Sequence, residues 1–399
     1  MLTVDEARAR ILAAFSSLPS IDVPIREALG MVPTHDVVAP HPSPRFDNSA
    51  MDGYAVRRAD LGDVPVTLEV IGEARAGSPP SGEVVAGTAI AVMTGAPVPA
   101  GADAVVPIED ADEDAGRVTV RAAPPGHGHI RPAGDDVRAG DLLVPAGREL
   151  DAGELAMLAT MGLSPVPVHR RPLITVLSTG DELVRPEVEP GPGQIRDSNS
   201  VALAALVRAA GGEVRVRGPI ADDRTEVERA LGNAAAGSDL VVSSGGVSVG
   251  RYDFVRDVIE QRGRLDLWRV AMQPGKPVVS GAIDGTPFLG LPGNPVSIHV
   301  GFEQFVRPAI RKMRGCREVL RPVVRARIGH RIEKKPGRLH FVRVRLSFEG
   351  GEVVATPTGP QGSHIQSSLL DAHGVARFDV DETVLDAGAE VTVEVWRLP

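Results

Sequence analysis

The sequence predicts a multidomain α/β and β protein: a central three-layer α/β domain with a mostly parallel sheet, an inserted small β domain, a helical N-terminal segment and a C-terminal β domain. Its 399 residues exceed one ordinary core, since domains usually hold ~100 to 200 residues. From residue 171, apolar strand segments alternate with amphipathic helical segments, as in parallel βαβ units buried on both faces. Short strands punctuated by Gly and Pro fill residues 54–145 and recur after 316, which indicates separate β domains.

The N-terminal segment predicts an amphipathic helix at 4–15, because apolar residues recur at helical spacing and Thr3 forms a capping box with Glu6. Prolines recur through residues 40–53, so this stretch cannot be helical. A second helix is predicted at 151–162, where another capping box begins it and a glycine ends it. If the two helices pack together, the β region between them is an insertion.

The α/β region predicts strands at 173–178, 214–218 and 239–244, and helices at 198–210, 223–236 and 253–262. Ligands of such sheets bind beyond the carboxyl ends of the strands. The whole chain is therefore divided into an N-terminal helical and linker domain (1–42 plus 140–169), an inserted β domain (43–139), a ligand-binding α/β domain (170–316) and a C-terminal β domain (317–399).

The composition excludes several classes of function. A formal net charge of −9 argues against a broad basic surface for nucleic acid. The single cysteine, Cys316, has no neighbours at zinc-ligand spacing and cannot form an internal disulfide. The acidic N-terminus does not resemble a signal peptide, and no apolar run approaches the ~18 residues of a membrane span. We expect a cytoplasmic protein that binds neither nucleic acid nor membrane.

The stretch "VVSSGGVSVGRYDFV", residues 241–255, predicts a strand that enters a glycine loop and leaves it as a helix. Gly245 and Gly250 have the spacing that begins a P-loop, but Arg251 and Tyr252 occupy the positions that need Lys and Ser/Thr. The loop therefore does not belong to a Walker ATPase. Backbone amides freed by its glycines, together with the following helix N-terminus, still suit an anion such as phosphate.

Acidic side chains follow three strands of the predicted sheet. Asp181 and Glu182 come after the first strand, Asp222 after the second, and Asp253 after the glycine loop. Each acid could simply cap a helix or a turn. If instead they converge beside a bound phosphate, they would repel it unless a cation lay between them, and Mg²⁺ is the natural bridge.

Other loops offer further polar groups. Lys276, one of only four lysines, lies in the glycine turn 272–277, and its compact ammonium suits a phosphate or carboxylate. The turn 290–297 starts a helix after Asn294. In the first half, loop 46–56 is dense in hydrogen-bond acceptors. Local turns are the alternative explanation for each of these loops.

Six motifs together resemble the MoeA family of molybdopterin molybdenumtransferases, to which the C-terminal part of gephyrin is related. In order they are "FDNSAMDGYAV", "MTGAPVP", "STGDEL", "SSGGVSVGRYD", "PGKP" and "GLPGNPVS". The resemblance covers nearly the whole chain. One motif alone is weak, and the "SGG" loop also resembles the smaller molybdopterin adenylyltransferases.

The resemblance implies a role in molybdenum cofactor biosynthesis. Members of the family bind adenylylated molybdopterin, cleave its pyrophosphate link with a divalent cation, insert molybdate and release AMP. They form homodimers with four domains per chain, in which the "AMDG" loop of one subunit meets the α/β domain of the other. Transient contact with other cofactor-biosynthesis proteins is also implied.

The resemblance further implies site residues at matching positions of this sequence. The catalytic set is Asp52, Thr94, Asp136, Glu182, Asp222 and Asp253, of which Glu182, Asp222 and Asp253 would hold Mg²⁺. The set that binds adenylylated molybdopterin and molybdate is Ser244, Gly245, Gly246, Ser248, Gly250, Arg269, Lys276, Pro292, Asn294, Arg343 and Ser363.

One position departs from the family pattern. Gln273 stands where the family often has a lysine, so one positive charge near the oxyanion is missing. Either molybdate binds more weakly, or Lys276 and Arg269 compensate. Two rival functions also remain: the adenylylation step itself, and a pterin carrier or scaffold without catalysis.

Overall fold

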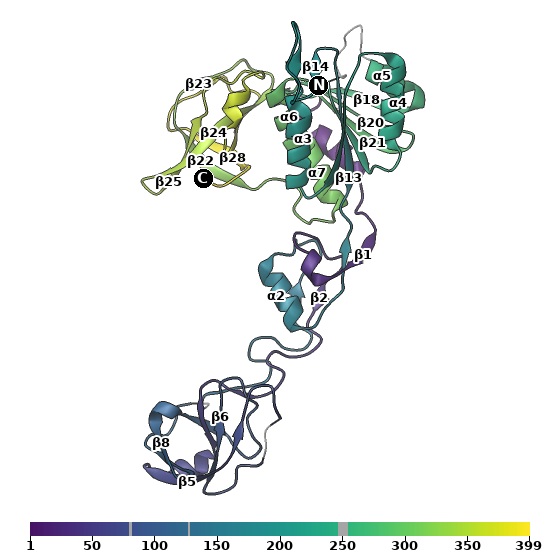
Figure 1. Ribbon diagram of the computed structural model, residues 1–399. Helices are drawn as coiled ribbons and strands as arrows, with labels where there is room; N and C mark the ends of the chain where they lie inside the picture. Colours follow the sequence, from purple (N-terminus) through teal and green to yellow (C-terminus); the bar gives the residue numbers. More distant parts are fainter. Residues whose placement is uncertain (80–81, 127, 246–253) are drawn as a thin grey trace. The chain divides into compact units, whose positions relative to one another are not determined.

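The computed structural model describes residues 1–79, 82–126, 128–245 and 254–399 (Figure 1). The chain forms two compact units. The large unit comprises Met1–His35, Ala146–Asp151 and Pro165–Pro399, and the insert unit comprises Asp36–Pro145 and Ala152–Ser164. The division into four domains remains a prediction.

A six-stranded mixed sheet forms the centre of the large unit, in the order β16-β13-β17-β21-β20-β18. Its strands are β13 (Leu173–Thr179), β16 (Glu213–Ile220), β17 (Leu240–Ser244), β18 (Gly263–Arg269), β20 (Pro277–Ile283) and β21 (Thr286–Leu291). The first four in the sheet order are parallel; β20 then pairs antiparallel with β21, and β18 pairs antiparallel with β20. The parallel strands therefore end at one edge, where ligands of such sheets bind.

The antiparallel half of this sheet follows from a turn signal that the sequence analysis did not use. β20 and β21 are joined by Asp284 and Gly285, whose φ angles of 48° and 84° are both positive. An Asp-Gly pair between apolar strands favours this tight hairpin turn. The sheet is mixed because this turn places β21 antiparallel to β20, the strand before it in the sequence.

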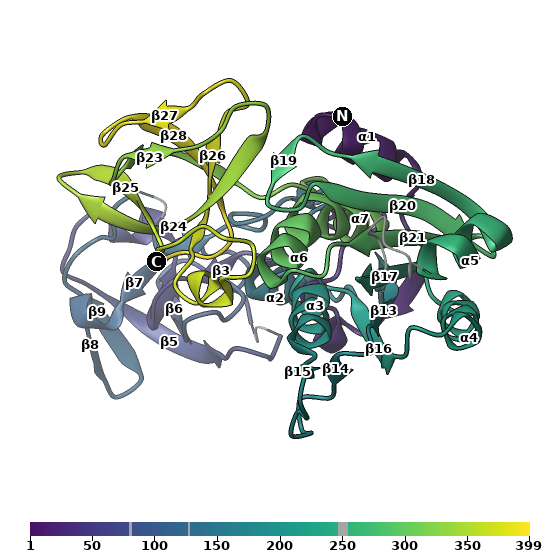
Figure 2. The same cartoon turned by 90° about the horizontal axis from the view of Figure 1, so that it is seen from above.

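Helices cover both faces of the sheet (Figures 1 and 2). One face carries α1 (Val4–Ala13), α3 (Ser198–Ala209), α6 (Pro295–Gly301), the π-helical segment η4 (Phe302–Val306) and α7 (Arg307–Met313); the other carries α4 (Arg224–Ala235) and α5 (Phe254–Arg262). Within β17, Leu240 and Val242 enter the first core and Val241 enters the second. Both faces of the strand are buried, as its continuous apolar run requires.

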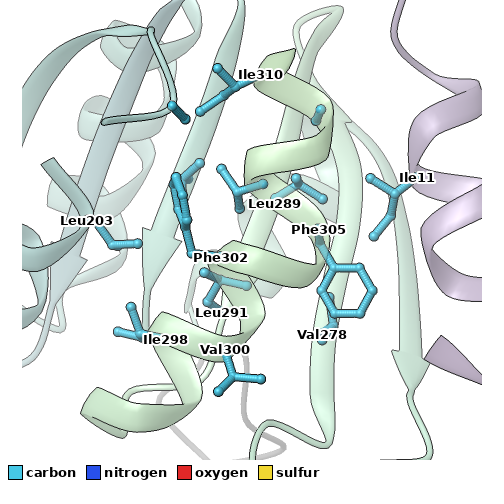
Figure 3. Close-up of a cluster of buried hydrophobic side chains, with 14 of the residues drawn as sticks. Ile11, Leu203, Val278, Leu289, Leu291, Ile298, Val300, Phe302, Phe305 and Ile310 are labelled. Carbon is cyan, nitrogen blue, oxygen red and sulfur yellow. The ribbon is translucent and has the colours of Figure 1, made fainter. Parts of the chain in front are cut away.

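The first helix packs against the central sheet of the large unit. Its Ile11 belongs to the same buried cluster as Phe302, Phe305 and Leu289 (Figure 3). Within the insert unit, α2 (Ala152–Thr160) contacts β11 (Leu142–Val144). Helical periodicity shows which side of a helix is buried but does not identify its partner.

The insert unit has its own six-stranded sheet, in the order β7-β4-β6-β5-β9-β8. Its strands are β4 (Gly53–Val56), β5 (Val66–Ala74), β6 (Thr88–Val92), β7 (Ala104–Pro107), β8 (Ala111–Asp114) and β9 (Arg117–Val120). Buried apolar residues lie in two clusters built on these strands. The β strands of the insert unit therefore have a hydrophobic core of their own.

The C-terminal strands close into a barrel, in the order β24-β25-β22-β28-β26 and back to β24. They are β22 (Val323–Ile328), β24 (Leu339–Glu349), β25 (Glu352–Pro357), β26 (Gly374–Phe378) and β28 (Glu390–Val395). The short strand β19 (Met272–Gln273) pairs with the start of β24, so the turn after it is attached to the barrel. None of the helices in the described residues is long and apolar enough to cross a membrane.

Candidate functional site

Two cavities lie where the parallel strands of the large unit end. The strand-end cavity, of about 350 Å³, is lined by Thr179, Glu182, Leu183, Ile195, Arg196, Asp197, Ser198, Asn199, Ser244, Gly245, Gly293, Asn294, Pro295 and His364. The Lys276 cavity, of about 360 Å³, is lined by Gln273, Pro274, Gly275, Lys276, Pro277, Pro292, Asn294, Ser297, Arg338, Gln361, Gly362 and Ser363. Asn294 lines both, so the two cavities are neighbours.

The strand-end cavity is built on the turns that follow β17 and β21. Gly245 has a φ of +84°, which glycine adopts without strain, and its N–H donates to Leu291 O at 3.1 Å. This bond ties the start of the glycine loop to the end of β21. His364, from the loop before the last strands of the barrel, completes the wall. The cavity therefore draws on two modules of the large unit.

The Lys276 cavity carries positive charge. Lys276 and Arg338 both line it, and neither makes an ion pair with another described residue. Gln273 and Ser363 add uncharged polar groups, and Val296 N–H donates to Ser363 O at 3.1 Å, which attaches the C-terminal loop to the start of α6. Two cations with no carboxylate partner suit an anionic ligand.

Three acids gather beside the strand-end cavity. Partial burial raises the pKa of Asp222 above its usual value, and the nearby charges of Asp181 and Glu182 raise it further. The backbone N–H of Asp222 donates to Asp181 Oδ1 at 3.0 Å. Gly180 makes room for the Glu182 carboxylate, which lies only 2.5 Å from where a Cβ at Gly180 would be. The loops after β13 and β16 thus bring negative charge together.

The predicted magnesium site remains a prediction. Within the described residues, no group of three or more His, Cys, Asp or Glu side chains is arranged to hold a metal ion. The third predicted ligand, Asp253, lies outside the described residues, as do Gly246, Ser248 and Gly250 of the glycine loop. Glu182 and Asp222 still supply the oxygen donors that Mg²⁺ prefers, in a place that already holds excess negative charge.

In the insert unit, Asp52 and Thr94 form a directly bonded pair. Asp52 Oδ1 accepts from the backbone N–H of Thr94 at 2.6 Å and from its hydroxyl at 2.9 Å. The bond from the Thr94 backbone N–H lowers the pKa of Asp52 most, and the bond from the Thr94 hydroxyl lowers it further. This exposed carboxylate therefore stays ionised at neutral pH. Gly53 holds the start of β4 against β7, because a Cβ there would lie 2.0 Å from Val106 O. The close packing of β4 against β7 thereby fixes the backbone position of Asp52, which directly precedes β4.

Asp136 makes no hydrogen bond to Asp52 or Thr94 among the described residues. Its side chain is exposed, and its backbone N–H donates to Ser43 O at 3.0 Å. The sequence grouped Asp136 with Asp52 and Thr94 by resemblance alone. A shared role for the three residues therefore stays a prediction.

Neither Arg343 nor Arg269 lines the two cavities, although the resemblance implied that both bind the ligand. Arg343 is fully buried, and its guanidinium donates to Pro360 O, Gln361 O, Gly362 O and Ser368 Oγ at 3.1–3.3 Å. Burial lowers its pKa to about 10. It holds the loop that carries Ser363 and lines neither cavity. Arg269 ends β18 opposite Pro277 and also lines neither cavity.

Several lining residues were missed by the sequence analysis. Asn199 belongs to the polar run "RDSNS" at 196–200, which spans the N-cap and the first turn of α3, and such a run at a helix start was an available signal. Arg338, Gln361 and His364 gave no local signal. They reach the site only because the barrel packs beside the sheet, which no short motif encodes.

Comparisons with known proteins agree on one family. Residues 2–162 match the MoeA N-terminal region (domain I and II), residues 175–312 match a probable molybdopterin binding domain, and residues 325–396 match the MoeA C-terminal region (domain IV). Molybdopterin molybdenumtransferase 2 of Mycobacterium tuberculosis is 39% identical over 100% of both chains. The chain belongs to the MoeA family.

Further members of the MoeA family support the assignment. Molybdopterin molybdenumtransferase of Haemophilus influenzae is 37% identical over 99% of this chain and 98% of its own. Among solved structures, a molybdopterin biosynthesis MoeA protein from Pyrococcus horikoshii OT3 is similar with a TM-score of 0.83 and 30% identity, covering 99% of this chain and 100% of that one. The family resemblance drawn from the six motifs is therefore confirmed.

Proposed function

We propose that this chain inserts molybdate into adenylylated molybdopterin, with Mg²⁺-dependent release of AMP, as a step of molybdenum cofactor biosynthesis in the cytoplasm. One observation carries the proposal. A cavity beside a glycine turn and an acidic cluster adjoins a cavity with two cations that have no ion-pair partner among the described residues, and both cavities share Asn294. A phosphate-bearing pterin and a separate oxyanion need two such neighbouring subsites.

The strand-end cavity would receive the phosphate-bearing part of the substrate. Ser244 Oγ and the turn at Gly245 line it, together with Asn199 and Asn294. Glu182 and Asp222 would hold Mg²⁺, which when bound offsets the negative charge of the phosphoanhydride. The two carboxylates orient the cation, and the glycine turn lets the substrate phosphate approach the backbone closely.

The Lys276 cavity would receive molybdate. Lys276 and Arg338 supply charge for this tetrahedral dianion, while Gln273 and Ser363 line the same cavity. Arg338 adds a second positive charge beside Lys276 in this cavity, whereas Arg269, offered with Lys276 as compensation for Gln273, does not line it. Arg343 contributes indirectly, because it fixes loop 360–362 next to Ser363.

The Asp52–Thr94 pair would act from the insert unit of a second subunit in a homodimer. An ionised Asp52, held by Thr94, can orient a water molecule or accept a hydrogen bond from a protonated ligand. Asp136 would belong to the same part of the site. Light scattering of the purified protein should give twice the 41.9 kDa mass of one chain; a mass of one chain would remove this part of the proposal.

The reaction itself is tested by mixing the protein with adenylylated molybdopterin, MgCl₂ and molybdate, and measuring AMP. We expect AMP release that stops when EDTA removes the metal. No release, with a substrate that an active relative converts, would reject the proposed function. ATP consumption with free molybdopterin would instead favour the adenylylation step, and tight pterin binding without turnover would favour a carrier.

Exchanging Gln273 for lysine should strengthen molybdate binding by about tenfold, because a second ammonium would face the dianion in the Lys276 cavity. Calorimetric titration with molybdate measures the change. The matched control is Gln366→Lys, which adds the same charge at an exposed position outside both cavity linings. Equal gains in both variants would show that overall charge, and not the cavity, governs affinity.

A further inference from the structure

Asn199 links the two turns that form the strand-end cavity. It lies in the first turn of α3, and its Nδ2 donates to Ser244 Oγ at 3.1 Å and to Gly293 O at 2.7 Å. Ser244 precedes the glycine loop, and Gly293 precedes Asn294, the residue shared by both cavities. One side-chain amide thus spans the gap between the ends of β17 and β21.

The chemistry of the partners fixes the orientation of this amide. A backbone carbonyl such as Gly293 O can only accept, so the NH₂ group of Asn199 must face it. The side-chain oxygen then has no hydrogen-bond partner among the described residues, while Asn199 itself lines the strand-end cavity. Both hydrogens of the NH₂ group are used to hold protein, and the oxygen remains available.

The first turn of α3 is itself anchored. Asp197, the N-cap, is 2% exposed; its Oδ2 accepts from Ser178 Oγ at 2.6 Å and its Oδ1 accepts from Ser200 N–H at 3.0 Å. Ser178 belongs to β13. Residues 197–199 are therefore bonded to the ends of β13 and β17 and to the turn after β21, and Asn199 cannot shift without breaking these bonds.

We propose that Asn199 is a positioning residue that sets the spacing between the phosphate-binding strand-end cavity and the oxyanion-binding Lys276 cavity. This inference rests on the proposed function. Asn294 lines both cavities, and Asn199 fixes the preceding residue, Gly293, relative to Ser244. Correct spacing matters because the dithiolene end of the pterin must reach the oxyanion while its phosphate stays bound.

The first test is the kinetics of Asn199→Ala and Asn199→Asp. The aspartate variant keeps the shape but places a carboxylate oxygen against Gly293 O. We expect the kcat of AMP release to fall about 10- to 100-fold in both variants, the scale of a small misplacement of reacting groups. The separate affinities for molybdopterin, by pterin fluorescence, and for molybdate, by calorimetry, should change less than about threefold. The control is Asn233→Ala and Asn233→Asp on the exposed surface of α4, which should match the unmodified protein.

The second test needs no activity. In the ligand-free protein, loss of two hydrogen bonds should speed hydrogen–deuterium exchange of the Gly245 amide by about 5- to 10-fold in Asn199→Ala and not in Asn233→Ala. Unchanged exchange at Gly245 would overturn the proposal even if the protein releases no AMP. Normal AMP release by Asn199→Ala, or a loss of kcat that only mirrors lost ligand affinity, would overturn it while leaving the proposed function intact.

Discussion

Asp222→Asn should reduce Mg²⁺-dependent AMP release by about 100-fold or more, while making the metal-free protein slightly more stable at neutral pH. The loss arises because an amide oxygen binds the cation more weakly than a carboxylate. The gain arises because the change removes a negative charge that partial burial and the charges of Asp181 and Glu182 disfavour.

The pH dependence of this gain has a defined sign. The pKa of Asp222 is raised in the folded protein, so the folded state binds its proton more tightly than the unfolded state does. The ionised side chain therefore lowers stability at neutral pH, and this effect disappears as the pH falls below its pKa. Thermal unfolding from pH 4 to 8 without Mg²⁺ should show the two proteins converging at the acidic end.

The matched control is Asp223→Asn, the same change one residue further along. Asp223 is the N-cap of α4 and accepts from Glu226 N–H at 3.0 Å, and asparagine caps a helix about as well. This variant should keep both its Mg²⁺-dependent turnover and its stability. Retention of normal metal-dependent release by Asp222→Asn would remove Asp222 from the proposed metal site.

Arg321→Ala should lower the free energy of unfolding of the large unit by about 3 kcal/mol, because it leaves a buried carboxylate short of its main partner. Arg321 bonds both carboxylate oxygens of Glu303, at 2.8 and 3.0 Å, and the Glu303 side chain is 1% exposed. The Arg307 guanidinium, 3.9 Å from Glu303, offsets only part of the loss. Denaturant unfolding followed by a probe in the large unit measures the change.

A surface ion pair provides the control for this measurement. Arg325 pairs with Glu390 at 3.3 Å, with both side chains largely exposed, so Arg325→Ala should leave the unfolding midpoint unchanged. The double variant Glu303→Gln with Arg321→Met should recover part of the lost stability, since no unpaired charge remains. Equal stability of Arg321→Ala and Arg325→Ala would mean that the Glu303 site is open to water.

The site could be predicted from sequence where a strand and its following loop are contiguous. Gly245, Glu182 and Asp222 were placed correctly at strand ends, because continuous apolar strands that alternate with amphipathic helices define a parallel sheet and hence its ligand-binding edge. The bonds of Asn199 join residues 45 and 94 positions apart, so no local pattern could reveal them. The direction of the Arg343 side chain was equally hidden, since it depends on how the closed barrel packs its loop 360–362.

The bond between α1 and η4 has a consequence for synthesis of the chain. Arg8 donates to Gln304 O at 3.1 Å across a separation of 296 residues. At ~5 to 20 residues per second, a ribosome needs about 15 to 60 s to make that intervening chain. The insert unit, complete by residue 164, can fold during this interval. The apolar side of the first helix cannot yet pack, because η4 has not been synthesised. The apolar side of that helix therefore stays without its η4 partner until most of the chain has been made.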